Sequence, residues 1–149
     1  MINTFKVESY IKLVQKSKLQ KLSKLEDFQR RSYRRFVYHQ TIYNNRLGYK
    51  KLINEFLEKK IDVINFAYQF VEFNKKVSGI ANCLLEDFEF LKSFQVNLND
   101  RKFGKLIMEI WDLCIGVIDD SFGDESIKID EPTIYNLIQE QFLELEKID

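Results

Sequence analysis

The sequence predicts an all-α fold: an antiparallel helical bundle of about four core helices, preceded by a basic helical N-terminal arm or hairpin. Three observations predict this class. Apolar residues recur at spacings of three and four through most of the chain, which places them on one face of a helix. No segment alternates apolar and polar residues at period two for long enough to form a strand. The composition, 45% hydrophobic and 31% charged, is typical of a globular protein.

The first helices are expected over residues 5–25 and 27–46, with the second supported by fewer apolar positions. Gly48 breaks the pattern, and a short apolar run follows at residues 52–57. The face of the first helix is formed by Val7, Ile11, Val14, Leu22 and Leu25.

Four further helices are expected to form the body of the bundle. The first begins at Asp62, a plausible N-cap, and ends at Ser78-Gly79. The others cover about 82–95, about 102–119, and a last helix that opens at Pro132. The strongest apolar stripe is expected on the third of them, where it comprises Ile107, Trp111, Cys114 and Ile118.

The formal charge of zero conceals a division along the chain. Residues 1–51 carry a net charge of +10, and residues 52–149 carry −10. We therefore expect a basic helical arm at residues 1–48 and an acidic helical-bundle domain at residues 49–149. A chain that begins at Gly48 is expected to keep its cooperative fold.

No pattern of catalytic residues is present. Glycine-rich phosphate loops, nucleophile elbows and H-E-x-x-H motifs are absent from the sequence. The single histidine, His39, has no neighbouring Cys, Asp or Glu, which favours a structural or surface role. A calcium loop starting at Asp120 would place Phe122 and Glu125 where a ligand and a glycine are needed. The expectation is a protein that is not an enzyme and has no cofactor and no metal site.

The sequence also indicates the surroundings of the protein. No stretch approaches the roughly 20 apolar residues that a membrane span requires. Cys83 and Cys114 belong to no C-x-x-C pair and predict two buried thiols in a reducing compartment, either the cytoplasm or an organelle stroma. The scarcity of Ala and abundance of Lys, Asn, Ile and Phe indicate an AT-rich bacterial or organelle genome. The basic, amphipathic start leaves a cleaved targeting segment open as an alternative.

Four arginines lie within six residues, interleaved with Tyr33 and Phe36. Guanidinium groups and stacking aromatic rings are suited to phosphate backbones and unpaired bases, so nucleic acid is one expected partner. The alternatives are a solvated helix face, docking on the protein's own acidic half, and an anionic protein or lipid surface. The residues concerned are Arg30, Arg31, Arg34 and Arg35.

Three stretches, at residues 52–70, 110–122 and 129–145, carry a resemblance over about residues 49–147 to the colicin D type of bacterial immunity protein. These are small helical bundles that protect a cell from its own nuclease toxin. The resemblance implies a non-enzymatic inhibitor that holds a basic nuclease domain, another protein, through acidic side chains standing in for RNA. The matching acidic residues are Asp119, Asp120, Asp124, Glu125, Asp130 and Glu131.

Two other interpretations stay open. The same acidic residues can be a solvated connection in which one carboxylate caps the last helix. The alternative function is a structural or assembly subunit of a larger organellar or RNA-associated complex, docked through its basic N-terminal helices.

Overall fold

A computed structural model describes residues 6–122 and 130–148, with side chains described at all of these except 120–122. The described residues form seven α-helices and contain no strand, so the all-α class is confirmed. The helices in chain order are α1 (Val7–Leu19), α2 (Lys24–Asn44), α3 (Arg46–Leu57), α4 (Val63–Glu86), α5 (Phe88–Ser93), α6 (Leu98–Phe122) and α7 (Glu131–Glu146).

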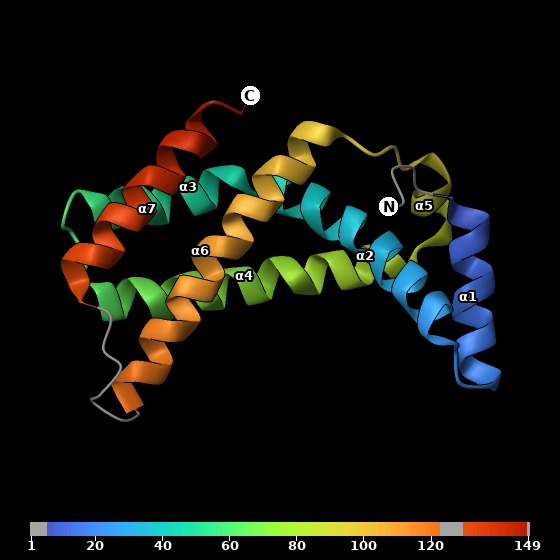
Figure 1. Cartoon of the computed structure of the whole chain (residues 1–149). Helices are drawn as coiled ribbons and strands as arrows, with labels where there is room; N and C mark the ends of the chain where they lie inside the picture. Colours follow the sequence, from blue (N-terminus) through green and yellow to red (C-terminus); the bar gives the residue numbers. More distant parts are fainter. Residues whose placement is uncertain (1–5, 123–129, 149) are drawn as a thin grey trace.

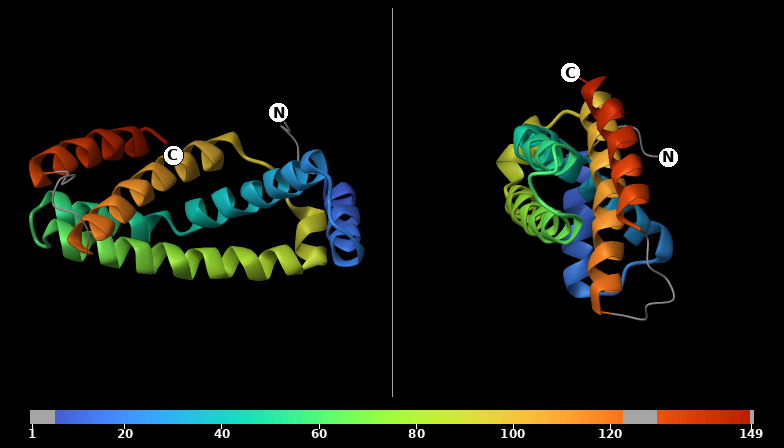
Figure 2. Two further views of the ribbon diagram at one scale, coloured as in Figure 1. Left: turned by 60° about the horizontal axis from the view of Figure 1, so that its bottom comes forward. Right: turned by 90° about the vertical axis from the view of Figure 1, so that its left-hand side faces the viewer.

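The helices form a bundle elongated along α4 (Figure 1). α2 and α3 follow one another along one side, and α4 returns beneath them in the opposite direction (Figure 1). α6 crosses this layer and packs against both α2 and α4. α7 packs against α3 and α6 at one end, whereas α1 and α5 contact each other at the opposite end (Figures 1 and 2).

Two groups of buried side chains hold the helices together. The smaller one joins Tyr10 and Leu13 of α1 to residues of α2, α4 and α5. The larger lies between α2, α3, α4, α6 and α7 and includes Tyr49, Phe66 and Phe70, all at most 1% exposed. Burying a side chain of this size stabilises the fold by about 1.5–3 kcal/mol relative to leaving it exposed.

Carboxylate and hydroxyl caps define the starts of several helices. Asp62 accepts a hydrogen bond from the Asn65 backbone N–H at 2.8 Å, which confirms the predicted N-cap of α4. Pro132 lies in the first turn of α7, as expected. The predicted first helix, 5–25, is too long, because Ser23 and Glu26 form a reciprocal capping box that starts α2.

The predicted helix end at Ser78-Gly79 is wrong, because α4 continues without a break to Glu86. One glycine costs a helix about 1 kcal/mol, which burial of Val77, Ala81 and Leu85 on the same helix outweighs. The expected helix at 82–95 is therefore divided between the end of α4 and the six-residue α5.

The buried face of α6 differs from the predicted stripe. Its buried residues include Ile107, Ile110, Cys114 and Val117, while Trp111 and Ile118 are only partly buried. Trp111 is therefore at the margin of the core. The prediction of two buried thiols is also wrong, since Cys83 is exposed, although burial does raise the pKa of Cys114 to about 12.

The predicted boundary between residues 48 and 49 falls inside α3. α2 packs against both α4 and α6, and Phe36, Val37 and Ile42 are buried there. α2 therefore packs as part of the bundle, and the separability of residues 1–48 stays a prediction for truncation to test.

Candidate functional site

A cavity of about 350 Å³ lies between α2, α4 and α6. Three of the four arginines singled out in the sequence, Arg31, Arg34 and Arg35, line it from α2. We call the buried lining residues, His39 and Ile42 of α2 and Asn74 of α4, the floor of the cavity, and Arg31, Arg35 and Met108 are exposed. The remaining lining residues are Tyr38 and Ser78.

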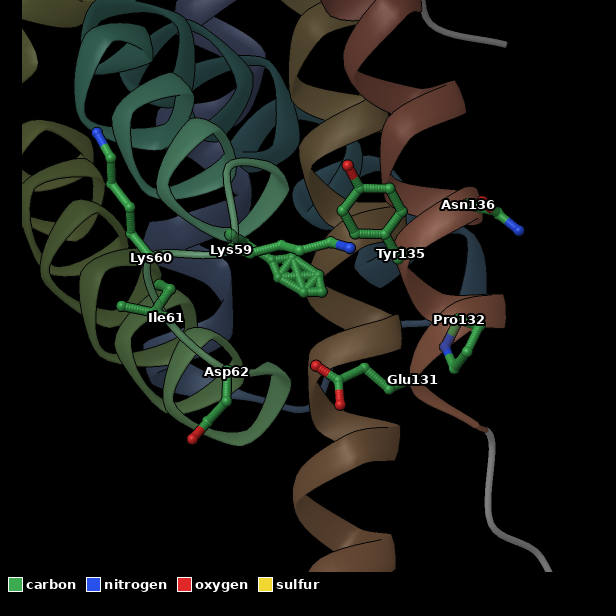
Figure 3. Close-up of a pocket in the computed structure, with 9 residues that line it drawn as sticks. Lys59, Lys60, Ile61, Asp62, Glu131, Pro132, Tyr135 and Asn136 are labelled. Carbon is green, nitrogen blue, oxygen red and sulfur yellow. The ribbon is translucent and has the colours of Figure 1, made fainter.

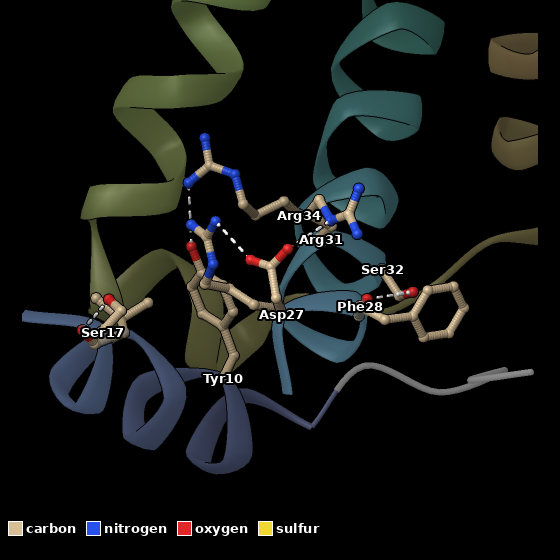
Figure 4. A network of polar contacts seen from close by, with 9 residues as sticks. Tyr10, Ser17, Asp27, Phe28, Arg31, Ser32 and Arg34 are labelled. Atoms are coloured by element: carbon tan, nitrogen blue, oxygen red, sulfur yellow. Dashed lines mark hydrogen bonds and ion pairs between the residues drawn. The ribbon is translucent and has the colours of Figure 1, made fainter. Parts of the chain in front are cut away.

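Arg34 is half-buried and is held by neutral oxygens. Its Nη atoms donate to the hydroxyls of Tyr10 and Tyr38 at 3.4 and 3.5 Å and to Asn82 Oδ1 at 3.1 Å. Tyr38 also donates to Asn82 Oδ1. Figure 4 shows Tyr10 rising from α1 towards Arg34. Because these partners come from α1, α2 and α4, packing of the bundle fixes the guanidinium in place without neutralising it.

The other three arginines differ in how far their charge is compensated. Asp27 forms ion pairs with Arg30 through Oδ1 and with Arg31 through Oδ2, each with an N···O distance of 3.1 Å (Figure 4). Arg30 does not line the cavity, so the structure separates it from its three neighbours. Arg35 is exposed, and within the described part of the chain neither Arg34 nor Arg35 forms an ion pair.

His39 is only 5% exposed, and its Nδ1 is buried with no hydrogen-bond partner among the described residues. Its ring lies against Gly104 of α6, where an added Cβ would be 2.6 Å from Cδ2. The helices can approach this closely only because residue 104 has no side chain. Burial lowers the pKa of His39 to about 4, assisted by the charges of Arg101, Arg35 and Lys105, so the ring is neutral at pH 7.

The basic group extends beyond α2. Arg101 and Lys105 of α6, together with Arg35 of α2, add to the lowering of the pKa of His39, so cations of two helices lie near enough to act on this ring. The guanidinium of Arg101 lies 5.4 Å from the centre of the Phe36 ring. We call Arg31, Arg34, Arg35, Arg101 and Lys105 the α2–α6 basic surface. The sequence interpretation missed its α6 members, which lie within the half of the chain that is acidic overall.

The structure describes only some of the six acidic candidates. Asp119 is exposed near the end of α6, and the side chain of Asp120 lies outside the described residues, as do Asp124 and Glu125 entirely. Asp130 caps α7 by accepting from the Thr133 backbone N–H at 2.7 Å, and these bonds lower its pKa. The interpretation that one carboxylate caps the last helix is therefore confirmed for Asp130.

Glu131 lines a second cavity, of about 500 Å³, between the α3–α4 turn and the start of α7 (Figure 3). Lys59 and Lys60 line the same cavity, with Lys59 Nζ 5.8 Å from the centre of the Tyr135 ring. Tyr135 in turn donates to the Leu57 carbonyl at 2.8 Å. Acidic and basic groups are thus mixed here, in contrast to the cavity under the α2–α6 basic surface.

Within the described ranges, no helix is long and apolar enough to cross a membrane. No group of three or more His, Cys, Asp or Glu side chains in those ranges could hold a metal ion. Comparison of the chain with protein-family models, with curated proteins and with solved structures finds no match.

Proposed function

We propose that the protein is a binding protein that holds single-stranded nucleic acid on the α2–α6 basic surface. The observation that carries the proposal is a cavity lined by three arginines of α2, of which Arg34 and Arg35 have no carboxylate partner among the described residues. Arg101 and Lys105 of α6 do not line this cavity, but they lie near enough to His39 to lower its pKa. The proposal develops the alternative of an RNA-associated subunit docked through its basic N-terminal helices.

Phosphate groups suit this surface for electrostatic reasons. Cations on neighbouring helices repel one another, and a polyanion relieves that repulsion while releasing its own condensed counterions. Arginine adds paired donors that match phosphate oxygens. Tyr38, on the wall of the cavity, adds an aromatic ring close to these cations, of the kind on which bases stack.

The test is a fluorescence-anisotropy titration of the full chain with single-stranded RNA of about 12 nucleotides, within the usual site size for such binding. Affinity should fall with added salt, with a logarithmic slope of about −0.7 for each phosphate neutralised. The double variant Arg35→Gln, Lys105→Gln should reduce the magnitude of that slope by about 1.4, because two of the contacts are lost. Both side chains are exposed, so the fold should tolerate the change.

The matched control is Lys59→Gln, Lys60→Gln, which removes the same charge at the α3–α4 turn, outside the α2–α6 basic surface. Its slope should equal that of the wild type. Equal slopes for the two double variants, or binding that does not respond to salt, would contradict the proposal.

The second candidate is the immunity-type inhibitor of a basic nuclease toxin. It is supported by the exposure of Asp119, Asp130 and Glu131, all from the acidic half of the chain. Capping of α7 already engages Asp130, and two lysines share the cavity of Glu131. The nucleic-acid proposal therefore comes first. A chain that binds no RNA in the titration, but captures a basic nuclease domain, would reverse this order.

A further inference from the structure

The cavity beneath the α2–α6 basic surface contains a buried polar group, which is not needed for binding the phosphodiester backbone of a nucleic-acid strand. Its floor contains His39, 5% exposed, with an Nδ1 that has no partner among the described residues. A buried polar nitrogen without a hydrogen bond costs about 1–3 kcal/mol, and in the neutral tautomer that carries its proton on Nδ1 a bound acceptor oxygen would recover this cost. A ligand in this cavity is thus expected to bring an acceptor oxygen down to the floor.

The charge of the cavity indicates the charge of that ligand. Arg31 shares Asp27 with Arg30, which leaves Arg34 and Arg35 as two cations without a carboxylate in the described structure. A phosphate monoester carries a charge of about −1.5 to −2 at pH 7 and three acceptor oxygens, whereas a diester carries one charge. Two uncompensated guanidinium groups match the monoester better than the diester.

The guanidinium group of Arg34 is preorganised for binding a ligand in this cavity. Three of its bonds go to Tyr10, Tyr38 and Asn82, so two of its five N–H donors remain for a ligand. Since those three residues lie on three different helices, the guanidinium is ordered before any ligand arrives.

The size and lining of the cavity agree with one phosphorylated terminal residue. A volume of about 350 Å³ is near the lower limit of ligand pockets and is too small for a run of nucleotides. Ile42 and Met108 supply apolar surface on which a sugar or base can rest, and Asn74 and Ser78 supply polar groups on α4.

We propose that this cavity binds a terminal phosphate monoester, held by Arg34 and Arg35 and by a hydrogen bond from the Nδ1–H of His39. The monoester is either the end of a nucleic-acid strand or a free mononucleotide. The first of these sources rests on the proposed function, and the second does not.

The experiment compares RNA strands of identical sequence that end in a 5′-phosphate, a 3′-phosphate or two hydroxyl groups. One phosphorylated strand should bind about tenfold more tightly than the hydroxyl strand, the factor expected from one additional charge-assisted hydrogen bond. Adenosine monophosphate should compete for this difference, whereas adenosine should not. Tight binding of the free mononucleotide without any binding of the strands would retain the cavity site and overturn the proposed function.

Variants of two lining residues test the assignment. His39→Asn keeps an amide N–H near the position of Nδ1 and should keep the tenfold preference, whereas His39→Leu removes the donor and should abolish it. Ser78→Leu, at a half-buried position on α4, fills the cavity without altering a cation and should abolish the preference too. Both variants that lose the preference should retain the salt-dependent binding of the hydroxyl strand.

Three outcomes would overturn the inference. The first is equal affinity of phosphorylated and hydroxyl strands together with no binding of adenosine monophosphate. The second is a preference that persists in Ser78→Leu. The third is a preference that His39→Leu keeps while its thermal unfolding matches that of the wild type.

Discussion

At the scale of single residues, His39 connects the stability of the protein to its candidate site. The ring fills the space left by Gly104, and its pKa is lowered to about 4 by burial and by the nearby charges of Arg101, Arg35 and Lys105. The packing that makes the ring part of the fold thus also keeps it neutral, so that Nδ1 donates a hydrogen bond only in the tautomer that carries the proton there. The sequence favoured a structural or surface role, and the structure assigns it a buried position.

Stability should therefore depend on pH through His39, the only histidine in the chain. The unfolded chain takes up this proton near pH 6.5, but the folded protein takes it up only near pH 4. Between these values the unfolded state binds more protons, so the free energy of unfolding should fall by about 3 kcal/mol as the pH drops from 6.5 to 4. This fall in the free energy of unfolding is measured by urea unfolding of the wild type and of His39→Leu at several pH values. Parallel pH dependences of the two proteins would contradict the prediction.

At the residue scale, the sequence could group only side chains that are neighbours along the chain. Arg31, Arg34 and Arg35 are neighbours in sequence and share one cavity. Arg101 and Lys105, which do not line that cavity, were missed because only the packing of α2 against α6 brings them near His39. Trp111 was assigned to the core because it falls on the expected apolar stripe, yet Ile110 is the buried residue, and hydrophobic spacing alone cannot distinguish two registers one residue apart.

At the scale of helices, caps were better indicators of ends than glycines. Asp62 and Pro132 mark true starts, and the Ser23–Glu26 capping box marks one that the apolar pattern obscured. Gly48 and Gly79 both lie inside helices. Gly48 instead permits a close approach of α3 and α4, since a Cβ there would be 2.3 Å from the Phe73 ring. Such a glycine is needed because of a residue on a neighbouring helix, so the sequence around the glycine cannot predict it.

Two glycine substitutions of the same chemical size should have opposite effects. At Gly79 an added Cβ meets nothing within 4 Å, so Gly79→Ala should raise the free energy of unfolding by about 0.5–1 kcal/mol through helix propensity. At Gly104 the Cβ would overlap the His39 ring, so Gly104→Ala should lower it by about 1–3 kcal/mol. Urea unfolding of both variants gives the comparison, and a stabilising Gly104→Ala would show that α2 and α6 can separate freely.

At the scale of the whole molecule, the bundle does not follow the division of charge along the chain. The basic α2 contributes Ile42 to the main core, and the smaller core joins α1 to α2, α4 and α5. The charge boundary near residue 51 was correctly read from the sequence, but it is no boundary of the fold. Charge is a property of exposed side chains, whereas the buried contacts that define a folding unit depend on apolar residues on the other faces of the same helices.

Two truncations should separate the contributions of α1 and α2. A chain that begins at Leu22 loses Tyr10 and Leu13 but keeps the Ser23 capping box and the whole main core. It should still unfold cooperatively, with a lower midpoint because Tyr33 and Val37 lose part of their cover. Thermal unfolding followed by circular dichroism at 222 nm measures both properties.

A chain that begins at Asn45 keeps α3 whole but removes α2 from its position against α4 and α6. The side chains of α4 and α6 that α2 covers would face water, and α6 would lose one of the two long helices on which it packs. We expect a broad, non-cooperative transition and reduced helicity, because helices of this length depend on tertiary packing for most of their stability. A sharp transition close to that of the full chain would instead restore the separable basic arm.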